Sequence, residues 1–486
     1  MSDILLSHAY FIAEDPREQG IMKPYPPLGL LYVSSHLKAK GFAVDLFDGT
    51  FKSMPDYENH LWTTRPPVTG LYCTLMSKPH VLKMIQLCKA AGSRVILGGP
   101  EPPPYALEYL RSGADVVVHG EGELALQELI PHLKRFGAAG LNSIDGISFL
   151  DEDGRLVQTP PRAQIINLSQ QPWPDREAID MDRYLDVWKT HHGSSSVSLI
   201  TSRGCPYTCA WCSHSVFGET HRRRQPWEVA EEVAWLQNKY APDRLWYADD
   251  VFTIHRGWLL EFAGELKKRG LKIPFECISR ADRLDDALIA ALREMGCFRL
   301  WIGAESGSQK ILDAMRRRTT IEDVRLKTRS LQNNGIQVGM FVMLGYEGEQ
   351  CSDIEATVDH LKKSAPDVFL STVAYPIKGT RYYEAVSSKI LSNLSWSART
   401  DRDLKISGRR SKRFYAHATR WMDNEVNFHK LLTRNSLNLP RMLKLLANAK
   451  RGRLGMWWTR NETEEDPSQG AGGRGWPSRE RAEAAW

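Results

Sequence analysis

Three of the eight cysteines lie close together in residues 201–212, at Cys205, Cys209 and Cys212. Their spacing is C-x3-C-x2-C, and Gly204 and Pro206 flank the first cysteine and favour a tight turn. The apolar run before them, residues 197–200, predicts a short strand, so the cysteines lie on the loop that leaves it. Thiolates are soft ligands that suit iron–sulfur clusters and zinc. Three ligands in one loop leave the fourth iron of a [4Fe–4S] cluster open, and an open metal position can bind a substrate or cofactor.

Two other interpretations of this loop stay open. His214 extends the pattern to C-x3-C-x2-C-x-H, which a Cys3His zinc site could use, and the three cysteines could instead be structural or disulfide-bonded. Zinc sites usually split into two ligand pairs separated by a longer loop, and this spacing does not. The remaining cysteines are scattered on apolar segments and are expected to be buried and reduced: Cys73, Cys88, Cys277, Cys297 and Cys351.

Length and composition limit the class of protein. A chain of 486 residues suggests about three domains, and 42% hydrophobic residues is ample for buried cores. No apolar run approaches the length of a membrane span, and the first residues lack the basic region and long apolar core of a signal peptide. Together with the reduced cysteines, this predicts a cytoplasmic protein.

The charge is distributed unevenly. Residues 381–460 contain 18 Lys and Arg against 5 Asp and Glu, whereas the whole chain has a net charge of +6. A basic region attached to a slightly acidic body predicts either contact with an anionic partner or a solvated helical face.

Residues 1–140 alternate between strand and helix patterns. Strands are expected at 4–11, 43–48, 68–76, 94–97 and 115–119, and helices at 27–40, 79–91, 105–112 and 123–136. This order predicts a doubly wound, Rossmann-like parallel sheet, in which ligands bind outside the carboxyl ends of the strands. Glycines that would let a backbone approach a large flat ligand closely lie at those ends, at Gly29, Gly98, Gly99 and Gly120. A G-x-G-x-x-G fingerprint is absent, so dinucleotide binding is not supported.

A second βα series begins near residue 196 and is preceded by a predicted linker. Residues 141–195 contain one hairpin, at 147–150 and 156–159, and several prolines that interrupt any long helix. Strands then follow at 197–200, 245–250, 275–280, 299–305, 338–344 and 368–375, with helices at 227–240, 258–269, 285–295, 321–333 and 351–363. Six βα units over residues 196–380 predict a partial (β/α)6 barrel, smaller than the closed eight-unit form.

The last part of the chain differs from the α/β domains. Residues 381–460 are expected to be helical, with helices at 423–433 and 441–450 and with Trp421, Trp457 and Trp458 among basic residues. A helical cap over the barrel and contact with an anionic membrane surface are both compatible with this pattern. No RNA-binding module is recognised, so no nucleic acid is expected. Residues 461–486 are rich in Gly, Glu and Arg and are predicted to be disordered.

The cysteine loop and the six βα units resemble the radical S-adenosylmethionine (SAM) enzymes. In that family the open iron binds the amino and carboxylate groups of SAM, and the cluster donates one electron to yield a 5′-deoxyadenosyl radical. Residues 303–308 (GAESGS) match the G-x-E-S-G-S motif of one branch. The resemblance implies that Trp211 packs near the adenine, that Arg280 pairs with the methionine carboxylate, and that Glu305 accepts hydrogen bonds from the ribose or the ammonium. The SAM-binding residues it implies are Trp211, Arg280, Glu305, Ser306 and Tyr375.

Residues 1–140 resemble the cobalamin-binding domain that precedes the barrel in that branch. The matching stretches are residues 25–32 (YPPLGLLY), 97–100 (LGGP) and 117–123 (VVHGEGE), although Glu101 stands where the branch often has His. The D-x-H-x-x-G motif that ligates cobalt in other proteins is absent, as is common in this branch. The implied cobalamin contacts are Pro27, Gly29, Gly98, Gly99, Gly120 and Glu121. The alternative is a degenerate Rossmann-like domain without a cofactor.

The resemblance therefore implies an enzyme that uses a [4Fe–4S] cluster, SAM and cobalamin. The first choice of reaction is methyl transfer to an unactivated carbon or phosphorus of a small, apolar or lipid-like substrate, with flavodoxin or ferredoxin as electron donor. A radical cyclase of the same branch and a non-enzymatic corrinoid- or metal-binding protein are the alternatives. A methylthiotransferase is disfavoured, because residues 1–140 contain only Cys73 and Cys88 and cannot hold a second three-cysteine cluster. In each enzymatic case the carboxyl ends of the two sheets must face one another across a cleft.

Overall fold

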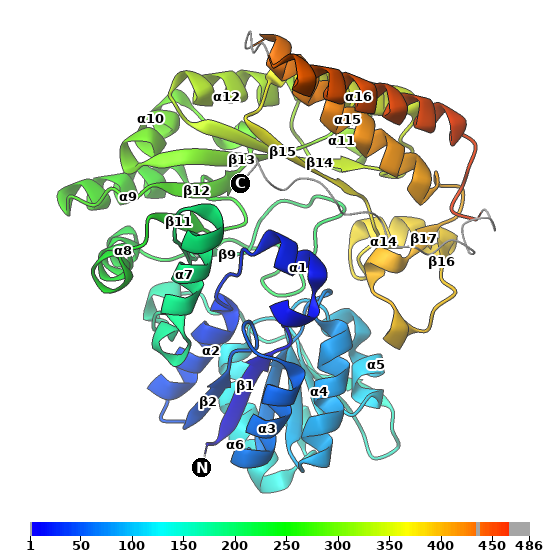
Figure 1. Ribbon diagram of the computed structural model, residues 1–486. Coiled ribbons are helices and arrows are strands. Elements are labelled where there is room, and N and C mark those ends of the chain that lie inside the picture. The colour runs from blue at the N-terminus through cyan, green and yellow to red at the C-terminus, as the bar shows by residue number, and fades with distance from the viewer. Residues whose placement is uncertain (1, 434–437, 466–486) are drawn as a thin grey trace.

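The computed structural model describes residues 2–433 and 438–465 and shows two α/β domains followed by helices (Figure 1). The N-terminal sheet has seven strands in the order β2-β1-β3-β4-β5-β6-β7. Its strands are β1 (Ile4–His8), β2 (Val44–Phe47), β3 (Val68–Tyr72), β4 (Arg94–Gly98), β5 (Val116–Val118), β6 (Ile147–Leu150) and β7 (Leu156–Gln158). Its helices are α1 (Pro16–Ile21), α2 (Leu28–Ala39), α3 (Met54–Thr64), α4 (Lys78–Ala90), α5 (Ala106–Arg111) and α6 (Gly122–Phe136).

The first five strands are parallel, which confirms the doubly wound arrangement. Two buried clusters cover opposite faces of the sheet, because alternate residues of each strand point to opposite sides. Leu5 and Leu97 pack on one face, and Leu6 and Ile96 pack on the other. The sequence pattern missed α3, whose start is fixed by a Ser53–Asp56 capping box but which buries only two side chains.

Residues 141–195 carry more structure than the predicted linker. The predicted hairpin forms, but β6 pairs with β5 in antiparallel fashion and extends the N-terminal sheet. Helix α7 (Met181–His192) was not predicted, and it buries Met181, Tyr184 and Trp188. The predicted linker thus lies over both domains and contains one helix that the sequence pattern missed, because apolar residues in both segments are buried against the N-terminal domain and the barrel.

The second sheet contains six strands in the order β15-β14-β13-β12-β11-β8, and all of its pairs are parallel. The strands are β8 (Ser196–Leu199), β11 (Arg244–Tyr247), β12 (Phe275–Ser279), β13 (Cys297–Glu305), β14 (Gln337–Leu344) and β15 (Val368–Val373). The helices are α8 (Pro226–Tyr240), α9 (Arg256–Lys268), α10 (Asp286–Met295), α11 (Gln309–Ala314), α12 (Ile321–Asn333) and α13 (Cys351–Ser364). The six predicted βα units are confirmed. A small antiparallel pair, β9 (Ser202–Arg203) and β10 (Arg222–Arg223), closes the cysteine loop.

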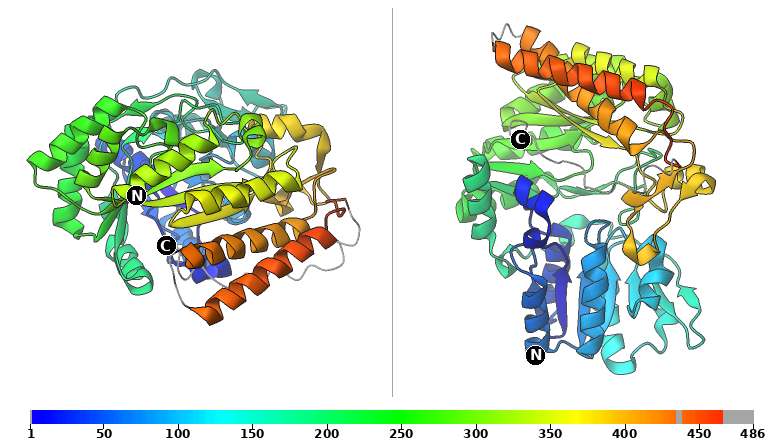
Figure 2. Two further views of the ribbon diagram at one scale, coloured as in Figure 1. Left: turned by 90° about the horizontal axis from the view of Figure 1, so that it is seen from above. Right: turned by 45° about the vertical axis from the view of Figure 1, so that its right-hand side comes forward.

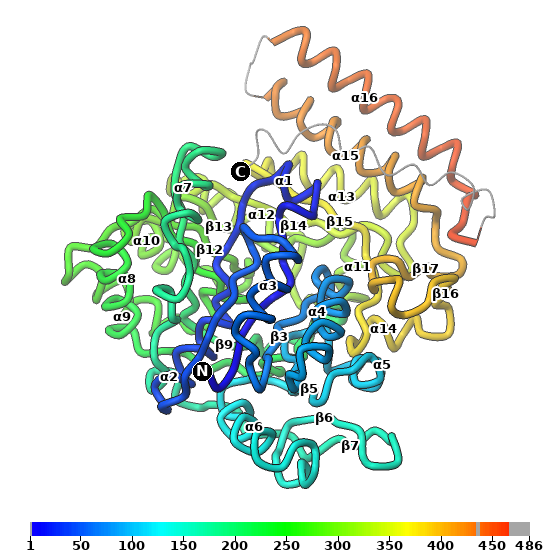
Figure 3. The backbone as a smooth tube through the Cα atoms, turned by 60° about the horizontal axis from the view of Figure 1, so that its bottom comes forward, coloured from blue at the N-terminus to red at the C-terminus, as the bar shows by residue number. Residues whose placement is uncertain are grey.

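The C-terminal region packs against the barrel rather than standing alone. It contains α14 (Arg381–Val386), β16 (Ile390–Leu391), β17 (Lys405–Ile406), α15 (Lys412–Thr433) and α16 (Leu439–Trp458). Side chains of α15 and α16, among them Phe414, Trp421 and Met456, join the main core cluster of the barrel. Figures 2 and 3 show the two helices side by side along the edge of the barrel that lies away from the N-terminal domain. None of the helices in the described part of the chain is long and apolar enough to cross a membrane.

The first residues of the tail that was predicted to be disordered are ordered. Glu464 is 2% exposed and pairs with Arg409 at 2.7 Å, and Thr463 bridges to Arg410. Residues 461–465 are therefore ordered, because a buried ion pair fixes them to the start of α15. The rest of that prediction, residues 466–486, lies outside the described residues.

The carboxyl ends of the two sheets face each other, as the chemistry predicts. The loop that follows β8 reaches the loops that follow β4 and β5. Ser215 Oγ donates to the carbonyl of Pro100 at 3.1 Å, and the carbonyl of Val216 lies next to Gly120. The cysteine loop therefore lies between the two domains.

Candidate functional site

The cysteine loop is fixed at its start by a buried carboxylate. Asp249, at the end of β11, is 1% exposed. Its carboxylate accepts from Thr201 N (2.7 Å), Thr201 Oγ1 (2.5 Å) and Ser202 N (3.1 Å), and from Arg223 Nη2 (3.0 Å). Asp249, the predicted acidic end of the second strand, thus orients the loop. Its two oxygens already accept four hydrogen bonds, so few lone pairs remain for a ligand.

The loop itself is held by backbone contacts to the barrel. Ala210 N donates to the carbonyl of Met315 (3.0 Å), and the carbonyl of Ala210 accepts from Tyr382 N (2.8 Å). Gly204 has a φ of +85°, and a Cβ there would lie 2.2 Å from the carbonyl of Thr220, so only glycine fits. Cys209 is buried, Cys205 is partly buried and Cys212 is exposed, and all three thiols are free.

Three soft thiolates on one rigid loop are a donor set that fits an iron–sulfur cluster. Within residues 2–433 and 438–465, no three His, Cys, Asp or Glu side chains are gathered as ligands of a single metal ion. His214, the fourth ligand of the Cys3His alternative, lines the same pocket as Cys209 and Cys212. Of the cysteines outside the loop, Cys73, Cys88, Cys277 and Cys297 are buried as expected, and Cys351 is partly buried.

Two arginines lie against the sulfur of Cys209. Arg317 Nη1 lies 3.7 Å and Arg280 Nη1 lies 3.9 Å from Cys209 Sγ. Arg280 is 2% exposed, pairs with Asp282 through Nε at 2.8 Å, and lies over the ring of Tyr207. The two cations favour a negatively charged group next to Cys209. The existing contacts of Arg280 leave only part of its guanidinium for the implied methionine carboxylate.

Glu305 lies beside Arg317 at the end of β13. Its backbone has a φ of +56°, an uncommon conformation for a residue other than glycine that often marks functional sites. Its Oε1 lies 3.9 Å from Arg317 Nε, and the side chain is buried. Burial raises the pKa of the Glu305 carboxyl, whereas Arg317 and Arg280 act in the opposite direction.

Of the other three implied SAM-binding residues, Trp211 and Tyr375 lie around this centre, whereas Ser306 is buried in a turn. Trp211 lies near this centre, with its ring 6.0 Å from the Arg317 guanidinium. Tyr375 follows Ala374, which shares an apolar cluster with Ala210, and the ring of Tyr375 lies under Arg402 at 5.4 Å. Ser306 is 1% exposed, and its hydroxyl lies 3.2 Å from Thr357 Oγ1 on α13. Ser306 thus holds a turn, and its side chain does not face an open site.

The carboxyl edge of the N-terminal sheet can receive a large flat ligand. A Cβ placed on Gly29 or Gly98 would meet no atom within 4 Å, so these backbones face open space. Gly99 has a φ of +101° and lies against the carbonyl of Cys73, where a Cβ would be 2.4 Å away. Pro27 caps the start of α2 beside Gly29. These residues fit the implied corrin contacts by shape.

Glu121 has a different environment from the one that the resemblance implies. Its carboxylate accepts from Arg203 Nη1 (2.6 Å), Arg222 Nη1 (2.7 Å) and Ile165 N (3.0 Å). Arg203 also pairs with Glu123 at 2.6 Å, and all of these side chains are buried. The charge of Glu121 is thus satisfied by the barrel domain and the pair joins the two domains, while its contact with cobalamin stays a prediction.

Glu101, which stands where the branch often has His, is 4% exposed. Its Oε1 has no hydrogen-bond partner, and burial raises the pKa of the carboxyl to about 7. Lys78 and Asp401 are among its charged neighbours, so a group of buried ionisable side chains lies just beyond Gly99.

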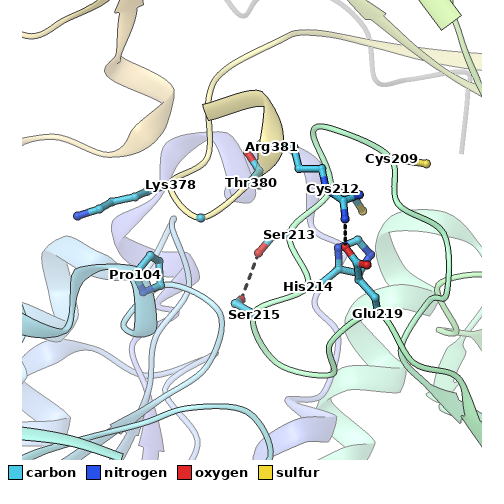
Figure 4. Close-up of a pocket in the computed structure, with 11 residues that line it drawn as sticks. Pro104, Cys209, Cys212, Ser213, His214, Ser215, Glu219, Lys378, Thr380 and Arg381 are labelled. Carbon is cyan, nitrogen blue, oxygen red and sulfur yellow. Dashed lines mark hydrogen bonds and ion pairs between the residues drawn. The ribbon is translucent and has the colours of Figure 1, made fainter. Parts of the chain in front are cut away.

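A polar pocket of about 230 Å³ opens beside the cysteine loop (Figure 4). One side is formed by Cys212 and by Ser213 and Ser215, which are hydrogen-bonded to each other. Lys378 and Arg381 line the other side, and Arg381 pairs with Glu219 at 2.7 Å. The pocket therefore reaches the cysteines from the junction of the two domains.

A second cavity, of about 170 Å³, lies against the inner face of the barrel. Aromatic rings dominate its wall, and the Trp301 and Phe341 rings stack at 5.0 Å. Phe341 pairs in register with Gly303, whose carbonyl accepts from Arg317. The residues that line the cavity are Lys23, Tyr25, Trp188, His192, Arg244, Trp246, Glu276, Trp301 and Phe341. Phe341, in the wall of the cavity, is therefore next along β14 to Val342, the residue that pairs with Glu305.

The sequence pattern missed the arginines that organise this site. Each of three consecutive arginines has a separate acidic partner: Arg222 binds Glu121, Arg223 binds Asp249, and Arg224 binds Glu228 and Glu232. Three adjacent arginines just before an apolar helix were a usable signal, because such a run is rarely left unpaired when the segment is buried. Arg317 carried the same signal, because it is the middle residue of a second run of three arginines, Arg316–Arg318, just before α12.

Comparison with known proteins identifies two parts of the chain. Residues 199–361 match the family model described as the radical SAM superfamily, and residues 21–130 match the B12 binding domain. An uncharacterized methyltransferase of Pyrococcus horikoshii is 28% identical over 388 residues, which cover 78% of this chain and 82% of that protein.

Two further relatives come from different comparisons. The anaerobic magnesium-protoporphyrin IX monomethyl ester cyclase of Rubrivivax gelatinosus is 28% identical over 359 residues, 71% of this chain and 63% of that protein. The solved structure of the cobalamin-dependent SAM radical enzyme OxsB with aqua-cobalamin has a TM-score of 0.73 at 17% identity, and covers 96% of this chain and 74% of that chain. At this level of identity, the similarity to OxsB shows a shared fold.

Proposed function

The chain belongs to the radical SAM superfamily and carries a B12-binding domain, and on that premise we propose that it is a methyltransferase that uses a [4Fe–4S] cluster, SAM and cobalamin. When bound, SAM and the cluster supply hydrogen abstraction, and cobalamin supplies the methyl group. The observation that carries this proposal is the position of the cysteine loop between the open glycine edge of one sheet and Glu305 of the other. A radical cyclase and a non-enzymatic corrinoid-binding protein are the alternatives.

The side chains that hold these groups follow from the geometry. Cys205, Cys209 and Cys212 are the proposed cluster ligands, and Arg317 and Arg280 stabilise negative charge beside Cys209. Glu305 and Trp211 are the proposed contacts to SAM, with Arg280 and Tyr375 at its margin. Gly29, Gly98, Gly99 and Gly120, with Pro27, form the proposed seat of cobalamin.

The inner cavity of the barrel supports an apolar substrate. A dry cavity of about 150 Å³ is large enough for benzene, so about 170 Å³ suits one flat ring system or a short apolar chain. The rings of Trp246, Trp301 and Phe341 supply the wall, while Arg244 and Glu276 place one charge of each sign at its margin. Burial lowers the pKa of Lys23 to about 7. We therefore propose a small molecule with an apolar body and a polar group.

The remaining partners follow from the same chemistry. Hydrogen abstraction through SAM requires one electron from an external donor, for which a flavodoxin or ferredoxin is suitable. Peripheral contact of the basic C-terminal region with a membrane is also part of this proposal, since a lipid-like substrate would be drawn from there.

Anaerobic reconstitution with and without cobalamin tests the function. Formation of both 5′-deoxyadenosine and S-adenosylhomocysteine supports methyl transfer. Formation of 5′-deoxyadenosine alone favours the cyclase, and retention of corrinoid with neither product favours a binding protein.

We expect Glu305→Ala to raise the KM for SAM by roughly 10- to 100-fold, the cost of losing one hydrogen bond to a charged group. The visible spectrum of the cluster should not change, because Glu305 does not contact a cysteine sulfur. Steady-state kinetics and absorption spectra measure the two effects. Glu322→Gln, at an exposed carboxylate on α12, is the control. An unchanged KM in Glu305→Ala would remove this residue from the proposed SAM site.

Cob(II)alamin bound to the protein should show no nitrogen splitting from a lower ligand in electron paramagnetic resonance. Each histidine of the N-terminal domain that could serve already has a polar partner. The partners are Asp48 for His8, Gln171 and Gln127 for His36, Asp45 for His60, Glu14 for His80 and Ser148 for His119. A triplet that disappears when one of these histidines is replaced would contradict the prediction.

A further inference from the structure

Helix α16 presents one apolar face to solvent. Gly452 and Gly455 let it pack closely on α15, because a Cβ at these positions would lie 2.6 Å from Trp421 N and 2.3 Å from the His417 ring. Ala449 and Met456 are also buried on this side. The face of α16 that packs on α15 is therefore fixed by these contacts, and the opposite face points away from α15. The two helices run side by side in Figure 3.

The opposite face carries large apolar side chains in a regular pattern. Leu443, Leu454 and Trp457 recur at helical spacing along one line, with Leu439 before them and Trp458 beside them. They are 62–80% exposed: Leu439, Leu443, Leu454, Trp457 and Trp458. A soluble domain seldom leaves so many large apolar groups on one stripe without a partner.

Cations border this stripe on both sides. Lys444 and Arg451 are seven residues apart and lie along one edge, and Arg453 and Arg460 are seven residues apart and lie along the other. Lys450 lies within the stripe, where its long side chain can extend to a polar boundary. Helix α16 contains no Asp or Glu, and within the described residues Glu355 of α13 is the one acidic group that pairs with its cations, at 3.4 Å from Arg453.

We propose that this face of α16 docks on an anionic lipid bilayer, with the helix parallel to the membrane plane. This proposal assigns the membrane contact of the proposed function to a defined surface. Docking of α16 does not require that the reaction be methyl transfer. The apolar stripe would enter the acyl boundary, the tryptophans would lie at the interface, and the two rows of cations would meet lipid phosphates. A protein partner would need acidic groups on both sides of an apolar ridge, and a nucleic acid would leave the leucines without contact.

Vesicle sedimentation of the full-length, cluster-loaded protein tests this proposal. Vesicles of phosphatidylcholine with phosphatidylglycerol should bind the protein, and binding should fall with added salt. Leu454→Ser combined with Trp458→Ser should weaken binding at least about tenfold through lost apolar burial. Lys444→Gln combined with Arg451→Gln should weaken it roughly fivefold for each cation removed. Trp227→Ser, at an exposed tryptophan of α8, should bind as the unaltered protein does.

Three results would overturn the proposal. The first is equal vesicle binding by all variants, and the second is equal binding to pure phosphatidylcholine. The third is a dimer, seen by analytical ultracentrifugation, that the Leu454/Trp458 variant dissociates, because the face would then belong to a second copy of the chain. Cleavage of SAM by the same samples is measured separately, so failure of the enzymatic proposal does not affect the outcome.

Discussion

Replacing Cys205, Cys209 or Cys212 with alanine should abolish both the brown chromophore of the reconstituted protein and the reductive cleavage of SAM. The physical reason is that each thiolate is one of only three protein ligands that the loop offers, and an incomplete ligand set does not retain a cluster. Absorption spectra, iron and sulfide content, and the yield of 5′-deoxyadenosine measure the effect. We expect the yield to fall to the level found without enzyme.

Cys351→Ala is the matched control for this experiment. Cys351 is a free, partly buried cysteine at the first position of α13, and it belongs to the barrel but not to the loop. This variant should keep full iron content and activity. The cluster assignment would be wrong if anaerobically purified protein contained stoichiometric zinc and no iron, or if a loop variant kept the chromophore.

Replacing Glu121 with alanine should destabilise the protein by about 3–5 kcal/mol, the usual cost of removing one partner from a buried ion pair. Arg222 would lose its carboxylate partner, and two of its three guanidinium nitrogens, Nε and Nη2, already lack a hydrogen bond. Arg203 would retain only Glu123. Guanidinium unfolding of the cofactor-free protein, followed by circular dichroism, measures the shift.

Glu128→Ala removes a comparable ion pair at the surface. Glu128 pairs with Arg162 at 2.7 Å but is 47% exposed, so its loss should cost about 0–1 kcal/mol. If Glu121→Ala costs no more than this control, the interdomain pair is not a source of stability. If it instead lowers only the affinity for cobalamin, then Glu121 is a corrin contact after all.

The sequence predicted the elements of the fold where apolar runs were continuous. Strand β14 was predicted at 338–344 and occupies Gln337–Leu344, because a strand buried on both faces is apolar throughout. Helix α15 begins at Lys412, eleven residues before the predicted start, since Phe414, Ala418 and Trp421 extend its buried face. Helix α7 was predictable, because Met181, Tyr184 and Trp188 have the i, i+3, i+7 spacing of an amphipathic helix, with Asp180 and Gly193 as its caps.

The candidate site was predictable only where it is local in sequence. The three cysteines lie within eight residues, so their spacing could be read directly. The Arg317–Cys209 contact spans 108 residues and the Arg203–Glu121 pair spans 82, and no local pattern encodes such distances. Glu121 and Ser306 lie in stretches that match family motifs, and the contacts of their side chains with Arg203 and Thr357 are likewise distant in sequence.

The pair of Arg203 with Glu121 also bears on the order in which the protein is made. Glu121 is synthesised 82 residues before Arg203, which corresponds to roughly 4–16 s on a ribosome that adds about 5–20 residues per second. Glu121 and Glu123 are therefore in place before the cysteine loop, which begins directly after Arg203, leaves the exit tunnel. The other anchors of the loop, Asp249, Met315 and Tyr382, come after it in the chain. The loop therefore meets its partner on the first domain early, and it reaches its final position only after the barrel has been translated.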